Sequence, residues 1–149
     1  MKNKTFLSLS SSQTKGLGKK IARDILSNHF QKKAVVIGLK GDLGGGKTTF
    51  VQGFALGLGI KEKIVSPTFV ILKVFDIKKA GFQKFYHLDC YRIENPEDVS
   101  ILELKEIISK SQNIVVIEWA EKIKKILPQN TIWLKFDFKG ANERKIEME

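Results

Sequence analysis

Eight residues in the first third of the chain have the types and spacing of a phosphate-binding loop. The segment spans residues 41–48 and reads Gly-Asp-Leu-Gly-Gly-Gly-Lys-Thr. A glycine, four further residues and then Gly-Lys-Thr is the pattern of a P-loop. Glycines let successive backbone N–H groups turn toward one phosphate, and a helix that starts there directs its positive end at the same point. The segment therefore predicts a site for a nucleoside triphosphate.

Two residues of this loop are expected to act directly on the nucleotide. Lys47 would reach the β- and γ-phosphates, and the Thr48 hydroxyl would bind Mg²⁺. An apolar run at 34–39 precedes the loop and a helix-like stretch at 49–56 follows it. The alternative, a flexible glycine-rich turn with a chance lysine, does not require these flanking elements. Strand, loop and helix together favour nucleotide binding.

A P-loop enzyme also needs an acidic residue for Mg²⁺ or its water shell, usually at the end of a buried strand. Two apolar segments end in a carboxylate: residues 114–117 lead into Glu118, and residues 85–88 lead into Asp89. Both acids would emerge at the carboxyl edge of the sheet, where open α/β folds bind ligands. One would serve the metal and the other would orient a water molecule. The alternative is that either acid only caps a turn.

Two basic side chains near Asp89 have two interpretations each. His87 lies on the same strand face as Asp89, so it contacts a phosphate or a partner, or it is a hydrogen-bonded interior histidine. Arg92 follows the same strand and contacts phosphate charge, or it forms an ion pair with Glu94 or Glu97.

Three other positions are also open to interpretation. Ser66 and Thr68 flank a proline before a strand, and they form either a small hydroxyl-bearing switch near the γ-phosphate or an ordinary turn. Trp119 is expected to pack in the core or at its rim. Cys90 is the only cysteine, so the chain has no internal disulfide. No motif pairs this cysteine with a base, which indicates a small strand-end residue rather than a nucleophile.

Alternating strand and helix patterns surround these motifs. The pattern predicts one P-loop ATPase domain over residues 1–149 with an α/β fold: a P-loop NTPase-like three-layer sandwich, its mixed sheet flanked by helices and parallel around the loop. Besides the elements above, we expect an edge strand at 5–7, a helix from Ser10 to about Phe30, and a hairpin of strands 69–75 and 82–88 with a polar turn at 76–81. A further helix is expected to open at 95–98 and to have Val99, Leu102 and Ile107 among its apolar positions. A short helix that ends at about Leu127 and a C-terminal β-hairpin of 131–138 and 144–148 would complete the fold.

Composition narrows the classes of function. No stretch is apolar enough to span a bilayer and no signal peptide is recognisable, so a cytoplasmic location is expected. Residues 1–75 hold 13 Lys and Arg against 3 Asp and Glu, whereas residues 76–149 hold 13 of each. This asymmetry indicates an anionic partner for the first half, such as nucleotide, RNA or an acidic protein surface, or a lysine-rich compositional habit.

Four motifs in this order resemble the bacterial TsaE family over nearly the whole chain. They are the P-loop at 41–50, Ser-Pro-Thr-Phe at 66–69, His-Leu-Asp-Cys-Tyr-Arg at 87–92 and Glu-Trp at 118–119. The family is the small ATPase required for threonylcarbamoyladenosine modification of tRNA beside the anticodon. The resemblance implies ATP or ADP and Mg²⁺ as ligands, and a transferase subunit with its paralogous dimer partner as partners. The ATPase would reset that transferase between turnovers, would be weak alone, and would contact tRNA at most indirectly.

The resemblance also implies roles for individual residues. Thr48 and Glu118 would ligate Mg²⁺, and Lys47 and Asp89 would be needed for hydrolysis. Residues 66–69 would form the nucleotide-sensitive switch. The nucleotide would contact the loop and the segment before the first helix, through Ser11, Thr14, Asp42, Leu43, Gly44, Gly45, Gly46, Lys47, Thr48 and Thr49. The chain departs from the family pattern in three places. Gly45 stands where alanine is usual, Ala120 stands where proline is common, and residues 102–104 stand where the family has a Leu-Gly pair.

Two other P-loop classes are alternatives. A small-molecule kinase would need an arginine-rich lid, which the chain lacks, since it has only three arginines. A GTP-driven switch would need an Asn-Lys-x-Asp segment to read guanine, and that sequence is also absent. ATP is therefore the expected nucleotide.

Overall fold

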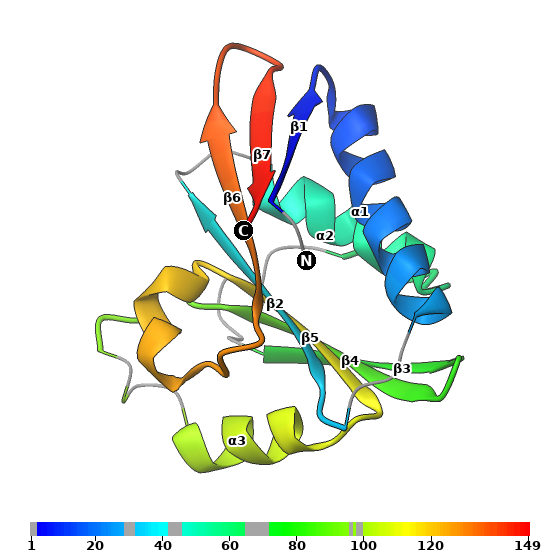
Figure 1. The fold of residues 1–149 in the computed structure, drawn as a ribbon, viewed down its shortest axis with the longest axis vertical. Coiled ribbons are helices and arrows are strands. Elements are labelled where there is room, and N and C mark those ends of the chain that lie inside the picture. Colours follow the sequence, from blue (N-terminus) through cyan, green and yellow to red (C-terminus); the bar gives the residue numbers. More distant parts are fainter. Residues whose placement is uncertain (1–2, 29–31, 42–45, 65–71, 96, 98–99) are drawn as a thin grey trace.

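The computed structural model of the chain describes residues 3–28, 32–41, 46–64, 72–95, 97 and 100–149 (Figure 1). In chain order its elements are β1 (Lys4–Ser8), α1 (Ser11–Ser27), β2 (Val35–Gly41), α2 (Lys47–Gly57), β3 (Leu72–Lys79), β4 (Phe82–Asp89), α3 (Ile101–Ser109), β5 (Asn113–Glu118), the 3₁₀ helix η2 (Ala120–Ile126), β6 (Ile132–Phe138) and β7 (Arg144–Met148). None of the helices in these ranges is long and apolar enough to cross a membrane.

The seven strands form one mixed sheet in the order β1-β7-β6-β2-β5-β4-β3. The four central strands, β6, β2, β5 and β4, run parallel to one another. Antiparallel pairs flank them: β3 pairs with β4 at one edge, and β7 pairs with both β6 and β1 at the other. The predicted mixed sheet, the C-terminal β-hairpin and the N-terminal edge strand are confirmed.

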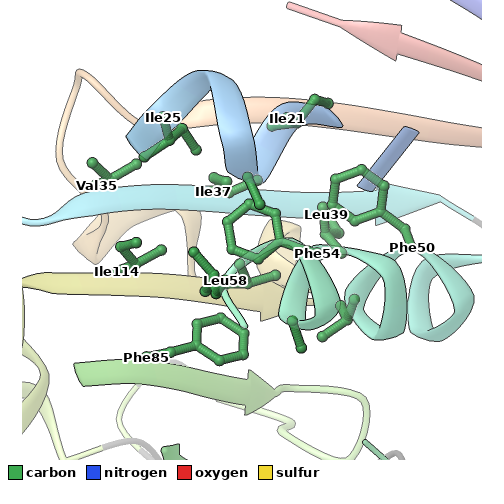
Figure 2. Close-up of a cluster of buried hydrophobic side chains, with 14 of the residues drawn as sticks. Ile21, Ile25, Val35, Ile37, Leu39, Phe50, Phe54, Leu58, Phe85 and Ile114 are labelled. Atoms are coloured by element: carbon green, nitrogen blue, oxygen red, sulfur yellow. The ribbon is translucent and has the colours of Figure 1, made fainter. Parts of the chain in front are cut away.

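Helices cover both faces of the sheet, as predicted for a three-layer sandwich (Figure 1). All six residues of β5 are buried, which explains the unbroken apolar run at 114–117 between its two polar end residues. Alternate residues of β2 point to opposite layers: Ile37 packs in the cluster under α1 and α2, and Val36 packs in the cluster under α3 and η2. Figure 2 shows the first cluster, in which Phe50 and Phe54 of α2 lie over the strands.

Glycines bring α1 and α2 into close contact. A Cβ atom built on Gly53 of α2 would lie 2.0 Å from the Lys15 carbonyl oxygen of α1. A Cβ on Gly57 would lie 2.7 Å from the Lys19 carbonyl oxygen, one helical turn further along both helices. Because no side chain separates the two backbones there, α1 fixes the position of α2, the helix that follows the phosphate-binding loop.

The hairpin of β3 and β4 differs from its prediction. A polar turn was expected over 76–81, but β3 continues to Lys79 and the turn is formed by Ala80 and Gly81, with φ of 53° and 87°. Positive φ at both central residues gives a two-residue turn whose twist matches that of the strands. The polar side chains belong to paired strands instead: Lys84 donates a hydrogen bond to Asp76 Oδ1 across the hairpin, at 2.7 Å.

Two helical predictions also need correction. Leu102 was predicted among the apolar positions of its helix, but its side chain is 83% exposed, and α3 packs through Leu104, Ile107 and Ile108. That helix begins at Ile101, later than the predicted 95–98, part of which lies outside the described residues. The first helix ends at Ser27, with Asn28 as its C-cap, rather than near Phe30, which is itself outside the described ranges. Local pattern marks a helix but does not fix its boundaries or its buried face.

Candidate nucleotide site

Three strands end together beside the start of α2. Strands β2, β5 and β4 are parallel neighbours, so their carboxyl ends meet at one edge of the sheet. Glu118, the last residue of β5, is paired with Leu39 of β2 on one side and with Asp89 of β4 on the other. Lys47 begins α2 after the loop that leaves β2. The fold therefore brings together the lysine and both carboxylates that the sequence singled out.

Both ends of the P-loop require glycine. Gly41 has φ of +129°, and a Cβ atom there would lie 2.1 Å from the Phe136 carbonyl oxygen of β6. Gly46 is the N-cap of α2 and has φ of +93°, with its carbonyl accepting the Phe50 N–H at 2.9 Å. Left-handed backbone of this kind favours glycine because it has no Cβ. The predicted contacts at Asp42, Leu43, Gly44 and Gly45 fall outside the described residues.

The Lys47 side chain lies at the base of the loop. Its Nζ donates a hydrogen bond to the Gly41 carbonyl oxygen at 2.7 Å and lies 4.0 Å from the centre of the Trp119 ring. The residue is only 5% exposed. An ammonium group on the face of an indole is attracted by the negative ring face. The positive charge of Lys47 therefore lies at the Gly41 end of the loop, and the residue itself begins α2, a helix end at which anions are favoured.

Thr48, Glu118 and His87 form one chain of hydrogen bonds. The Thr48 hydroxyl donates to Glu118 Oε1 at 2.8 Å, and His87 Nε2 lies 2.6 Å from Glu118 Oε2. Glu118 is 3% exposed and His87 is fully buried. A buried carboxylate requires such partners, because its removal from water is otherwise unfavourable. Of the two interpretations of His87, the hydrogen-bonded interior histidine is the one that the structure supports.

The chemistry of these donors suits Mg²⁺. A hydroxyl oxygen from the start of the helix and a carboxylate oxygen from the neighbouring strand lie within hydrogen-bond distance of each other. Mg²⁺ prefers hard oxygen ligands, keeps several waters and takes one or two protein groups together with substrate phosphates. Thr48 and Glu118 fit that requirement.

Asp89 has a turn-capping contact and lies beside the acid of β5. Its Oδ1 accepts the backbone N–H of Tyr91 at 2.9 Å, which stabilises the turn after β4. Register pairing places Asp89 directly opposite Glu118, and neighbouring strands lie about 4.8 Å apart. Arg92, the residue after Tyr91, is exposed. The predicted switch at Ser66 and Thr68 falls outside the described residues.

A small polar pocket lies beside Gly46 on the side of α1. Thr14 is buried and shares a hydrogen bond of 2.6 Å with the Ser8 hydroxyl, whereas Ser11 is exposed. Ser10 caps α1 by accepting the Gln13 N–H at 3.1 Å. The pocket is lined by Ser10, Ser11, Thr14, Gly46, Thr49, Asn142 and Arg144. Ser11, Thr14 and Thr49, predicted to contact nucleotide, thus share one pocket that opens next to the loop.

Two residues of this pocket were not identified from the sequence. Asn142 and Arg144 come from the C-terminal hairpin, and Arg144 Nε would lie 3.6 Å from a Cβ built on Gly46. The Arg144 guanidinium also lies over the Phe138 ring, 4.6 Å from its centre. They belong to no motif, and the pairing of β7 with β6 and β1 brings them to the pocket. Their only sequence signal was that Arg144 is one of three arginines.

Trp119 was expected in the core or at its rim, and it has a more specific position. Its backbone is left-handed, with φ of 58°, immediately after β5. The ring contacts Lys47 Nζ on one side and lies 5.2 Å from the Tyr91 ring. Lys122 Nζ is 5.8 Å from the same indole and donates a hydrogen bond to the Tyr91 carbonyl. The tryptophan therefore forms a wall of the site beside the lysine.

Cys90 has the environment of an unreactive thiol. Its side chain is fully buried, and this burial raises the pKa of the thiol to about 12, with the Asp89 carboxylate as a further cause. A thiol in such surroundings stays protonated near neutral pH. The structure therefore agrees with a strand-end packing residue.

Known proteins match this chain along most of its length. The family model described as "Threonylcarbamoyl adenosine biosynthesis protein TsaE" matches residues 8–146. A Bacillus subtilis protein named tRNA threonylcarbamoyladenosine biosynthesis protein TsaE is 37% identical over 147 residues, which are 98% of this chain and 85% of the relative. The Haemophilus influenzae protein of the same name is 36% identical over 131 residues, 88% of this chain and 79% of that protein.

The fold matches as well. The crystal structure of YdiB from B. subtilis superposes with a TM-score of 0.74 at 32% sequence identity, and covers 99% of this chain and 84% of that one. The four sequence motifs, the geometry around Thr48 and Glu118 and these similarities lead to one assignment. The chain belongs to the TsaE family.

Proposed function

We propose that this protein binds ATP with Mg²⁺ and hydrolyses it as the accessory subunit for threonylcarbamoylation of adenosine beside the anticodon of tRNA. The names of its relatives, tRNA threonylcarbamoyladenosine biosynthesis proteins, support the pathway. The single observation that supports the nucleotide chemistry most strongly is the Thr48–Glu118 hydrogen bond, because it joins the P-loop helix to the acid of the neighbouring strand at 2.8 Å.

Phosphate binding would depend on positive charge at the start of α2. Lys47 is the first residue of α2 and its amine already lies beside the loop end at Gly41. Backbone N–H groups at a helix N-terminus add partial positive charge at the same place. When bound, Mg²⁺ would neutralise developing charge on the β- and γ-phosphates. Thr48 and Glu118 would hold it, and Lys47 would exchange its carbonyl partner for phosphate oxygens.

Hydrolysis requires a water molecule aligned with the terminal phosphate. Asp89 is the carboxylate adjacent to Glu118, on the same edge of the sheet. Glu118 is bound by Thr48 and His87, and we assign the orientation of that water to Asp89 because its strand position places it directly beside Glu118. Positioning and electrostatics supply most of the rate in phosphoryl transfer. We expect the chain alone to hydrolyse ATP slowly, because a partner would be needed to complete the switch.

The proposed partners are a threonylcarbamoyl-transferase subunit and its paralogous dimer partner, with the ATPase resetting that complex between turnovers. Contact with tRNA would be indirect, and the protein would act in the cytoplasm. The nucleoside end of ATP would lie in the pocket of Ser11, Thr14 and Thr49, beside Arg144.

Equilibrium binding of ATP and ADP to the wild-type chain and to Lys47→Ala tests the nucleotide site. We expect binding to the wild-type chain and a loss of at least tenfold in the variant, because the buried amine is removed from the loop. Lys40→Ala is the matched control, since Lys40 pairs with Glu149 at 2.9 Å outside the site. Equal nucleotide affinity in Lys47→Ala would contradict the assignment. Tighter binding of GTP than ATP, or phosphate transfer to an added nucleoside, would favour a switch GTPase or a kinase.

A further inference from the structure

His87 is a buried polar residue whose hydrogen bonding is incomplete. It lies on β4, is fully buried, and its Nε2 is 2.6 Å from Glu118 Oε2. Its other ring nitrogen, Nδ1, is buried and has no hydrogen-bond partner within the part of the chain that the structure describes. Leaving a buried polar atom unpaired destabilises the folded protein. An apolar residue would fill the core at this point without that cost, so the ring is not explained by packing.

The contacts of the two nitrogens fix the direction of the hydrogen bond. A carboxylate only accepts hydrogen bonds, so Nε2 must carry the proton that it shares with Glu118. With the proton on Nδ1 instead, the Nε2 lone pair would face the carboxylate lone pairs, and a buried donor would have no acceptor among the described residues. His87 Nε2 is therefore the donor, and Glu118 Oε2 the acceptor.

The hydrogen bond from His87 leaves the second carboxylate oxygen of Glu118 for Thr48 of α2. His87 binds Oε2 of Glu118, while Thr48 binds Oε1 at 2.8 Å. A glutamate side chain held by hydrogen bonds at both oxygens has already lost the rotamer entropy that metal binding would otherwise have to remove. Since β4 and β5 are paired at His87–Val116 and Asp89–Glu118, the histidine stands one step behind the acid on the same face. It binds Glu118 from the side away from the open edge of the sheet.

We propose that His87 is a positioning residue of the metal site. By donating from Nε2 to Oε2, it holds the Glu118 carboxylate so that Oε1 points at Thr48, where the two oxygens together receive Mg²⁺. The inference rests on the proposed function, and it assigns to His87 neither phosphate contact nor proton transfer. Partners that orient metal ligands in this way typically change metal affinity by about 10–100-fold when removed.

Three substitutions separate the hydrogen bond from the bulk and polarity of the ring. His87→Gln carries an amide N–H₂ at about the reach of Nε2. His87→Asn carries the same amide at the reach of Nδ1, too short for Oε2. His87→Leu removes both polar atoms. Leu88→Val is the matched control, because Leu88 is the next residue of β4, is 2% exposed and packs on the other layer.

The measurement is Mn²⁺ binding to the complex of each full-length variant with ADP, by electron paramagnetic resonance. ADP affinity in excess EDTA and the melting temperature are measured in parallel. We expect the Mn²⁺ dissociation constant to rise at least tenfold in His87→Asn and His87→Leu and less than threefold in His87→Gln and Leu88→Val. Metal-free ADP affinity should stay within threefold of the wild-type value throughout.

Three results would overturn this inference. Mn²⁺ affinity that is unchanged in His87→Asn and His87→Leu would show that Glu118 needs no positioning group. Equal losses in His87→Gln and His87→Asn would show that the ring shape, not the Nε2 donor, matters. If the loss of Mn²⁺ affinity paralleled the fall in melting temperature in every variant, Leu88→Val included, His87 would have only a structural role. If the wild-type chain did not bind ADP in EDTA, the proposed function itself would fail, a result separate from these three.

Discussion

Gly53 of α2 lies so close to the backbone of α1 that one added methyl group should push the two helices apart. A Cβ atom at this position would lie 2.0 Å from the Lys15 carbonyl oxygen and 2.6 Å from its Cα. Cβ atoms essentially never approach other heavy atoms within 3.0 Å. The Gly53→Ala variant must therefore move α2 by about 1 Å or more, because the obstacle is backbone and cannot rotate away.

The expected loss of stability follows from two opposing effects. Overpacking of a close interface costs about 1–3 kcal/mol, and a backbone obstacle favours the upper end. Alanine in place of a glycine within a helix stabilises the folded state by about 0.5–1 kcal/mol. The net loss is about 2 kcal/mol, which for a chain of this length lowers the melting temperature by about 8 °C at about 4 °C per kcal/mol.

Gly16→Ala provides a matched control. Gly16 lies in α1, two residues before Gly18, and a Cβ atom there has nothing within 4 Å. Only the gain in helix propensity applies, so the melting temperature should rise by about 2–4 °C. Thermal unfolding followed by circular dichroism at 222 nm measures both variants. A Gly53→Ala protein as stable as wild type, or stabilised as much as Gly16→Ala, would refute the close packing of α1 on α2.

Three further predictions concern the site. Asp89→Ala should retain ATP affinity within threefold and lose hydrolysis at least tenfold, and unchanged turnover would show that another group orients the water. The Cys90 thiol, with its pKa raised to about 12, should have about a thousandfold less thiolate than an ordinary thiol at pH 8. It should react with a thiol reagent only after unfolding, so rapid labelling of the native protein would contradict its burial. Trp119→Phe should abolish most of the fluorescence change on nucleotide binding, whereas Trp133→Phe should preserve it, because only Trp119 contacts Lys47.

The sequence was most informative where local chemistry leaves few options. The spacing of glycines, Lys47 and Thr48 predicted a strand, loop and helix, and the structure places β2 and α2 on either side of that loop. Apolar runs that end in an acid predicted Asp89 and Glu118 at one edge of the sheet. Parallel pairing of their strands brings the two together.

Other features depend on contacts between distant residues and could not be predicted. Arg144 reaches the pocket because β7 pairs with two strands from opposite ends of the chain. Leu102 looks like a core residue by spacing, yet α3 turns it toward solvent. The two interpretations of His87 could be separated only once its burial and its distance to Glu118 were known.

The central proposal is that this chain hydrolyses ATP at its P-loop and thereby resets a tRNA-modifying transferase between turnovers. The most direct test is ATP hydrolysis by the purified protein, alone and with its cognate transferase pair and tRNA, with threonylcarbamoyladenosine measured in the same reactions. We predict slow hydrolysis alone, strong stimulation by the pair, and repeated cycles of modification only when the wild-type chain, not Lys47→Ala, is present. An ATP hydrolysis rate that is the same with and without the partners would contradict this proposal. So would tRNA modification that continues through many cycles without this protein.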